Sequence, residues 1–118
     1  MQYMFNKCID FNQPLNNWDV SNVIKMRAMF GACASLNQPL NNWDVSKVIN
    51  MECMFVLCFT FNQPLQKWNV SNTTSMGCMF AKCDNFNQPL NSWNISNRTF
   101  VNVYKMFMGC PILKEYKY

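Results

Sequence analysis

The residues of this 118-residue chain that could do chemistry are mainly seven cysteines and six acidic side chains, and histidine is absent. Five cysteines share one position of a repeated phrase and two share another; they are Cys8, Cys33, Cys58, Cys83 and Cys110, then Cys53 and Cys78. The spacing within the pair Cys53 and Cys58 suits neither a zinc knuckle nor a redox Cys-x-x-Cys motif, and an odd count leaves no closed disulfide framework. We therefore expect small, buried, reduced thiols and no metal site.

The acidic residues give little support for catalysis. Asp19 and Asp44 hold equivalent positions in two copies of the phrase, and Asn69 and Asn94 continue that column without charge. A nucleophile would need a base other than histidine, and neither a glycine-rich phosphate loop nor a cluster of carboxylates occurs. The sequence therefore predicts a protein that is not an enzyme and needs no cofactor.

The elements that position these residues come from a phrase that returns every 25 residues. Phe11-Asn12-Gln13-Pro14-Leu15 has copies that start at residues 36, 61 and 86, and a tryptophan follows each copy, at positions 18, 43, 68 and 93. Similarity at a period of roughly 20 to 50 residues indicates stacked units that bury their apolar faces against one another. We predict a single repeat domain over residues 1–118, with an irregular tail at 111–118.

Two patterns within the repeat predict its local structure. Met26, Met29, Phe30 and Cys33 have the spacing of one side of a short helix. Leu15-x-x-Trp18-x-Val20 alternates like one face of a strand. We therefore expect an α/β solenoid of about four 25-residue coils, each with a short parallel strand and a short helix. The methionine, phenylalanine and tryptophan columns should form its core, and Asn12 and Gln13 should bond to the next coil.

These residues resemble a known family. Phe-Asn-Gln-Pro-Leu-x-x-Trp-Asp/Asn-Val-Ser-Asn-Val, followed by Met-x-x-Met-Phe-x-x-Cys, is similar to the BspA-like leucine-rich repeats, also called the bacterial surface protein 26-residue repeat. The resemblance covers roughly Met4 to Cys110 and implies a leucine-rich-repeat-like solenoid that serves in binding and adhesion. Members occur on bacterial surface proteins, and cysteine-bearing, asparagine-rich versions occur in large DNA viruses and protists.

The composition and net charge of the chain limit the kinds of partner that we expect. The net charge of +4 comes from scattered lysines and arginines without a basic run, so we expect no nucleic-acid binding. The longest apolar stretch, residues 53–59, is far below the ~20 residues of a spanning helix, so no membrane insertion is expected. No small-molecule substrate is indicated. The chain starts without a signal segment, and reduced cysteines favour an intracellular or virion setting over secretion.

Function is therefore predicted to be protein interaction without catalysis. Outward positions beside the tryptophans should form a polar patch on the concave face of the strands: Asn17, Asp19, Asn42, Asp44, Lys67, Asn69, Ser92 and Asn94. Phe59, in the variable turn, is a second candidate binding residue. The alternative is a structural component of a larger assembly, such as a viral particle, joined through uncapped ends of the solenoid.

Overall fold

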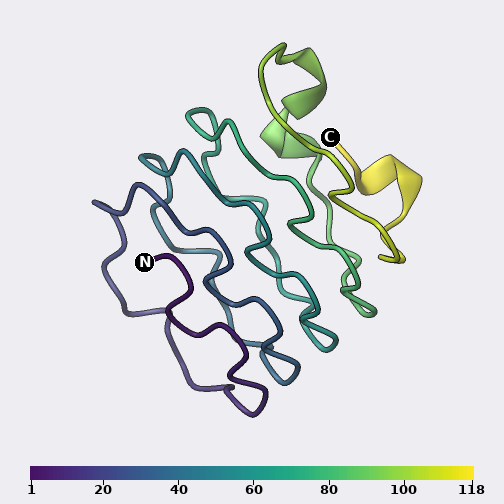
Figure 1. Ribbon diagram of the computed structural model, residues 1–118. Coiled ribbons are helices and arrows are strands. Elements are labelled where there is room, and N and C mark those ends of the chain that lie inside the picture. The colour runs from purple at the N-terminus through teal and green to yellow at the C-terminus, as the bar shows by residue number, and fades with distance from the viewer.

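The computed structural model covers residues 1–118, and in it the chain winds into successive loops that lie side by side (Figure 1). We number the repeats by residues: repeat 1 is 1–25, repeat 2 is 26–50, repeat 3 is 51–75, repeat 4 is 76–102, and repeat 5 is the shorter 103–118. The molecule measures 37 × 31 × 20 Å. Equivalent residues of neighbouring repeats are therefore neighbours in space.

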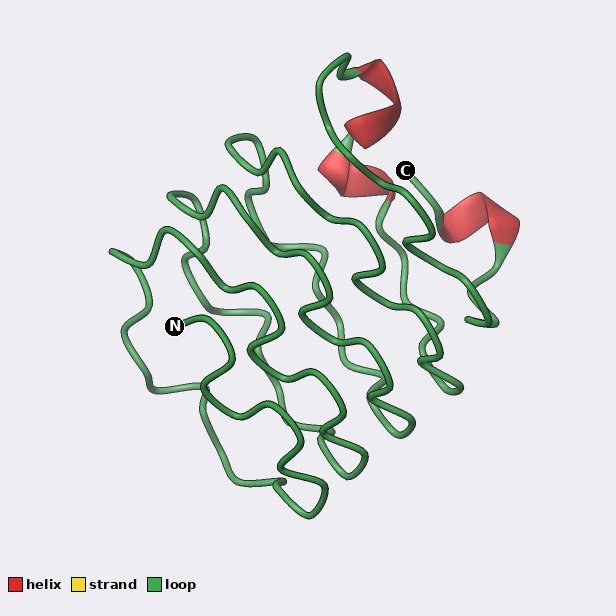
Figure 2. Cartoon of the chain, in the orientation of Figure 1, coloured by secondary structure: helices red, strands yellow, loops and turns green.

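Regular secondary structure is almost absent (Figure 2). The helices are three short 3-10 turns, η1 (Asn91–Trp93), η2 (Ile95–Asn97) and η3 (Lys114–Tyr116), and none approaches the length or apolar character needed to cross a bilayer. Strand pairing is limited to isolated parallel bridges that join Lys25, Asn50, Ser75 and Asn102 in turn. The predicted α/β solenoid with a strand and a helix in each of four coils is wrong, because the chain consists mostly of turns and loops.

The expected helix over residues 26–33 is replaced by two consecutive β-turns. The amide of Met29 donates to the carbonyl of Met26 at 3.1 Å, and the amide of Cys33 donates to that of Phe30 at 2.9 Å. The third residue of each turn has a positive φ, 50° at Ala28 and 59° at Ala32, as type II turns require. Two four-residue turns place their first and last residues on one side, which gives the same spacing as a helix.

Hydrogen bonds between repeats explain why turns replace the helix. The amides of Ala28, Phe30 and Ala32 donate to the carbonyls of Glu52, Met54 and Val56 in the next repeat, at 2.9, 3.0 and 2.7 Å. In an α-helix these amides would donate to carbonyls four residues back in their own segment. A left-handed non-glycine residue costs roughly 1 to 2 kcal/mol, and the bonds between repeats offset that cost.

The expected strand around Trp18 is also a turn. The amide of Trp18 donates to the carbonyl of Leu15 at 3.0 Å, and Trp43 repeats this bond with Leu40. Side chains still alternate after the turn, since Trp43 and Val45 are buried and Asp44 is exposed. The alternation that suggested a strand therefore arises at the exit of a β-turn, and no sheet, flat or concave, is formed.

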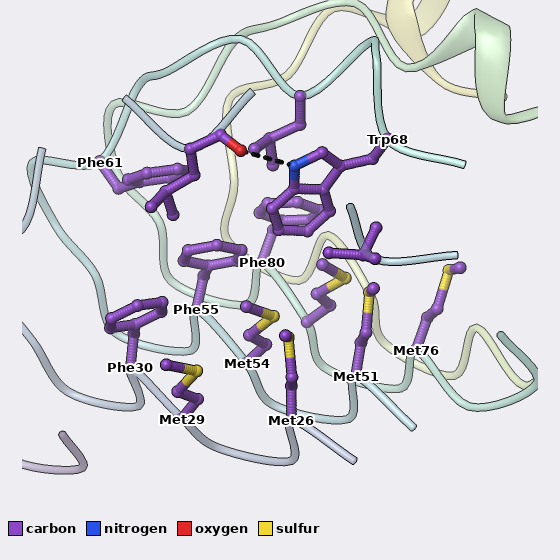
Figure 3. Close-up of a cluster of buried hydrophobic side chains, with 14 of the residues drawn as sticks. Met26, Met29, Phe30, Met51, Met54, Phe55, Phe61, Trp68, Met76 and Phe80 are labelled. Atoms are coloured by element: carbon purple, nitrogen blue, oxygen red, sulfur yellow. Dashed lines mark hydrogen bonds between the residues drawn. The ribbon is translucent and has the colours of Figure 1, made fainter. Parts of the chain in front are cut away.

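The core consists of columns of identical or similar side chains (Figure 3). The rings of Phe5, Phe30, Phe55, Phe80 and Phe107 stack with centroids 5.6 to 5.8 Å apart. Met26, Met51 and Met76 lie in a parallel buried column. The prediction that these columns form the core is confirmed for repeats 2 to 4, whereas in repeat 1 Met4 is 48% and Trp18 is 41% exposed.

Polar ladders join the repeats outside the core. The Asn12 side-chain oxygen accepts from the amide of Asn37 at 2.9 Å, and the Gln38 side-chain nitrogen donates to the Asn12 carbonyl at 2.9 Å. The same bonds recur between the next two pairs of repeats. The structural role predicted for the Asn-Gln pairs is confirmed.

All seven cysteines are free. Cys33, Cys58 and Cys83 are buried. Each Sγ donates to a phenylalanine carbonyl in the preceding repeat, and these carbonyls belong to Phe5, Phe30 and Phe55 respectively. Burial raises the pKa of Cys33 to about 11 and that of Cys58 well above its ordinary value. The predicted packing role is confirmed for these three thiols, whereas Cys8 is exposed.

Candidate functional site

The candidate site is a hollow of about 360 Å³ at the junction of repeats 3 and 4. Nine residues line it: Trp68, Asn69, Val70, Ser71, Ser92, Trp93, Asn94, Asn97 and Arg98. They belong to equivalent turns of the two repeats and to η1 and η2. Its volume falls at the lower end of the range found for small-ligand pockets, so it can hold a compact group.

Two tryptophans and Val70 form the apolar part of the hollow. Trp68 and Trp93 stack with centroids 6.3 Å apart and planes 2° from parallel, and only 3% and 4% of their surfaces are exposed. Each indole nitrogen donates to a leucine carbonyl of the preceding repeat, at 2.8 Å to Leu40 and 3.0 Å to Leu65 (Figure 3 shows Trp68). The rings are therefore held in place without a ligand.

The eight residues of the predicted polar patch are all exposed. Asn69, Ser92 and Asn94 come together in the hollow. Five others are not among its lining residues: Asn17, Asp19, Asn42, Asp44 and Lys67. Since no concave sheet exists, the surface they share is an edge built from turns. We call it the tryptophan edge, and define it by these eight residues together with Ser71, Asn97 and Arg98.

Phe59 does not take part in this site. Its side chain is 41% exposed, and it is not one of the residues that line the hollow. The structure therefore separates the two candidate binding positions, and only the tryptophan edge has a depression.

Sequence reasoning missed Asn97 and Arg98. Arg98 occupies the column of Val23, Val48 and Thr73, and its guanidinium donates to the carbonyls of Val70 at 2.8 Å and Thr73 at 2.6 Å. The available signal was a charged residue in an otherwise uncharged column. It also begins residues 98–105, a stretch that is two residues longer than its counterparts in the earlier repeats and that we call the two-residue insertion of repeat 4.

The charge on the tryptophan edge differs between repeats 1 and 2 and repeats 3 and 4. In repeats 1 and 2, hydrogen bonds from the hydroxyl and amide of Ser21 and Ser46 hold the pKa of Asp19 and Asp44 below their usual values. In repeats 3 and 4 the carboxylates are replaced by Asn69 and Asn94. The lining of the hollow thus contains one guanidinium and no carboxylate.

The comparisons place the chain in a family. A family model described as "Mycoplasma protein of unknown function, DUF285" matches residues 1–116. The chain belongs to this family. The matched region of this DUF285 member includes both repeats that form the hollow. No curated protein and no solved structure matches the chain. The resemblance to BspA-like repeats stays a prediction.

The chemistry available in the hollow of this DUF285 member is hydrogen bonding beside an apolar wall. Its lining includes no cysteine, aspartate or glutamate. Nowhere in the structure do three cysteine or acidic side chains lie close enough to hold a metal ion. The arrangement is suited to holding a polar group against a fixed apolar wall.

Proposed function

We propose that this chain is a non-catalytic protein-interaction module that binds its partner through the tryptophan edge. The observation that supports this most strongly is the position of the hollow, which opens among residues that the sequence predicts to face outward. A partner would place a side chain in the hollow and extend along the neighbouring repeats.

The other polar surface is less suited to recognition. The Asn-Gln pairs are bonded from one repeat to the next, as at Asn37 and Gln63. A ligand would have to break these bonds before it could use the amides. The tryptophan edge retains side-chain donors without a partner in the stack, which a ligand can engage at no such cost.

The rigidity of the hollow also supports a binding role. Trp68 and Trp93 are locked by buried hydrogen bonds, and binding would order few additional side chains there. Pre-organised sites gain affinity because association immobilises less.

The test is a peptide-display selection against the intact chain, followed by affinity measurements on two tryptophan variants. Ser92→Trp places a bulky ring at the hollow, whereas Asn85→Trp makes the same bulky substitution at an exposed turn position outside the tryptophan edge. We expect the selected peptides to lose about tenfold or more in affinity for the Ser92 variant and to bind the Asn85 variant normally. A selection that yields no binder, or binders indifferent to Ser92→Trp, would contradict the proposal.

A second candidate function, as a component of an assembly, has separate support. The carbonyls of Gln2, Met4 and Asn6 accept no hydrogen bond, although equivalent carbonyls in repeats 2 to 4 accept amides of the preceding repeat. The amides of Lys105 and Phe107 likewise donate to no carbonyl. The two edges are complementary, and a further repeat could join either one.

Two contacts of the C-terminal tail oppose this second function. The ring of Tyr118 lies 6.0 Å from that of Phe107, and the Lys117 ammonium lies 5.3 Å from the same ring. The tail thus covers the last phenylalanine of the stack. Light scattering across a concentration series, under reducing conditions, separates the two functions: concentration-dependent growth supports assembly, and a constant mass near 13.9 kDa contradicts it.

A further inference from the structure

The hollow of the tryptophan edge has an unequal supply of hydrogen-bond donors and acceptors. The Asn69 side-chain oxygen accepts from the amide of Ser71 at 3.1 Å. The Asn94 side-chain oxygen accepts from the side-chain nitrogen of Asn97 at 2.6 Å. Each oxygen has used one of its two lone pairs, so each amide still offers one acceptor site and two N–H donors. Neither Nδ2 has a partner within the protein.

The serine of repeat 3 adds a donor. In repeats 1 and 2 the hydroxyls of Ser21 and Ser46 donate to Asp19 and Asp44 at 2.5 and 2.6 Å. Ser71 makes only the backbone bond to Asn69, so its hydroxyl is free to donate to a ligand. Replacing aspartate by asparagine has therefore released a hydroxyl as well as removed a negative charge.

Arg98 supplies positive charge at the same place. Two of its five N–H groups are used by the carbonyls of Val70 and Thr73, and these bonds fix the guanidinium at the hollow. The remaining N–H groups can serve a ligand. Since the lining has no carboxylate, nothing in the hollow neutralises this charge.

We propose that the hollow binds a compact oxyanion, a carboxylate or a phosphate, through Asn69, Ser71, Asn94 and Arg98. Several oriented donors beside one fixed cation stabilise an oxyanion through charge-assisted hydrogen bonds, and the vacant acceptor sites of such a ligand match the donors in excess. This inference rests on the proposed function, and it assigns an acidic or phosphorylated group to the part of the partner that enters the hollow.

Repeats 1 and 2 are a built-in comparison. Their equivalent positions carry Asp19 and Asp44, whose carboxylates accept bonds and repel anions. The equivalent turns therefore repel anions in repeats 1 and 2 and offer hydrogen-bond donors in repeats 3 and 4, which we call the donor-rich form. The two-residue insertion of repeat 4 and Arg98 occur beside the donor-rich form.

The experiment is a titration of the intact chain with sodium acetate, sodium phosphate and sodium chloride at matched ionic strength, followed by ¹H–¹⁵N spectra of side-chain amides and indoles. We expect saturable shifts at Asn69, Asn94 and the indoles of Trp68 and Trp93 with an oxyanion and not with chloride. The ratio of the acetate and phosphate affinities identifies the better ligand. Shifts that never saturate, or that chloride reproduces, would overturn the proposal.

Asn69→Asp is the decisive variant, because aspartate is already accommodated at this position in repeats 1 and 2 and the fold should persist. We expect oxyanion affinity to fall about tenfold or more through repulsion by the new carboxylate. Asn85→Asp, which adds the same charge at an exposed turn position outside the tryptophan edge, should leave the affinity unchanged. Equal affinity in the wild type and the Asn69 variant would contradict the assignment.

The result separates this inference from the proposed function. Peptides that bind at the hollow while neither oxyanion shifts its signals would defeat the inference alone. Oxyanions that bind at the hollow while no peptide does would defeat the protein-interaction role alone.

Discussion

At the residue scale, each buried tryptophan joins two repeats with a single hydrogen bond. The indole N–H of Trp43, Trp68 and Trp93 donates to a leucine carbonyl 28 residues earlier, at 2.8 to 3.0 Å. Tryptophan is required because a phenylalanine ring could fill the space but could not satisfy the buried carbonyl. The bond therefore explains why tryptophan recurs at this position.

Replacing Trp68 by phenylalanine should lower the free energy of unfolding by about 1 to 3 kcal/mol, because the Leu40 carbonyl loses its donor. Urea denaturation measures the change. Trp18 is the matched control: it is 41% exposed and its indole has no partner. Trp18→Phe should change stability by at most about 0.5 kcal/mol. Similar losses in the two variants would show that ring packing, and not the hydrogen bond, decides stability.

Because several thiols are buried, we predict that the free energy of unfolding falls at alkaline pH. Burial raises the pKa of Cys33 to about 11, whereas an unfolded cysteine titrates near about 8.5. Above the unfolded pKa the native state holds more protons, so its stability is complete at neutral pH and falls as pH rises towards 11. Urea denaturation between neutral pH and this value should show the decline, and Cys33→Ala should make it shallower. An unchanged slope in the variant would contradict the assignment to this thiol.

At the element scale, each repeat is a succession of β-turns, and this explains which parts of the fold could be predicted from the sequence and which could not. The core columns were predictable because turns and helices share the spacing of Met26, Met29, Phe30 and Cys33. The turns themselves could not be predicted, because residues other than glycine, such as Cys53, occupy their left-handed positions. The sequence therefore lacks the glycines that usually indicate such turns. Whether the segment forms turns or a helix depends on hydrogen bonds to the next repeat, and the residue pattern within one repeat does not predict these bonds.

The candidate site was predictable to a similar extent. Asn69, Ser92 and Asn94 were identified because they flank a buried tryptophan and must face outward. Arg98 was missed because its position depends on carbonyls of Val70 and Thr73 in the preceding repeat and on the insertion in repeat 4. Contacts between repeats, rather than the repeat itself, create the hollow.

Ala32→Gly distinguishes turn from helix directly. Ala32 has a φ of 59°, so glycine should relieve roughly 1 to 2 kcal/mol of left-handed strain against about 0.5 to 1 kcal/mol of added chain entropy. We expect unchanged or slightly increased stability in thermal unfolding. Ala34→Gly, where φ is not positive, should instead destabilise by about 0.5 to 1 kcal/mol. A loss of about 1 kcal/mol at Ala32 is the result that a helix would give.

At the scale of the whole molecule, the stack behaves as a one-dimensional array in which each repeat contacts only its neighbours. Phe55 is central in this array, since its ring stacks on those of Phe30 and Phe80 at 5.6 Å and on Phe61 at 4.4 Å. Repeats 3 and 4, which form the hollow, are therefore supported from both sides. A rigid binding site in the interior of the array is a consequence of this arrangement.

Phe55→Ala should destabilise the protein by about 3 to 5 kcal/mol, because a cavity opens in the middle of the column. Phe5, at the start of the column, is only partly buried, and its alanine variant should cost clearly less. Calorimetric unfolding of both variants measures the difference. Equal costs would mean that the column does not act as a continuous core.

The most direct test of the account is to map, by ¹H–¹⁵N chemical shifts, where a display-selected peptide contacts the intact chain. We predict that the largest shifts fall on Asn69, Ser71, Asn94 and the indoles of Trp68 and Trp93, with little change at the Asn-Gln ladder. Shifts centred on Phe59, or spread over the ladder around Asn37 and Gln63, would contradict the claim that the tryptophan edge is the recognition surface.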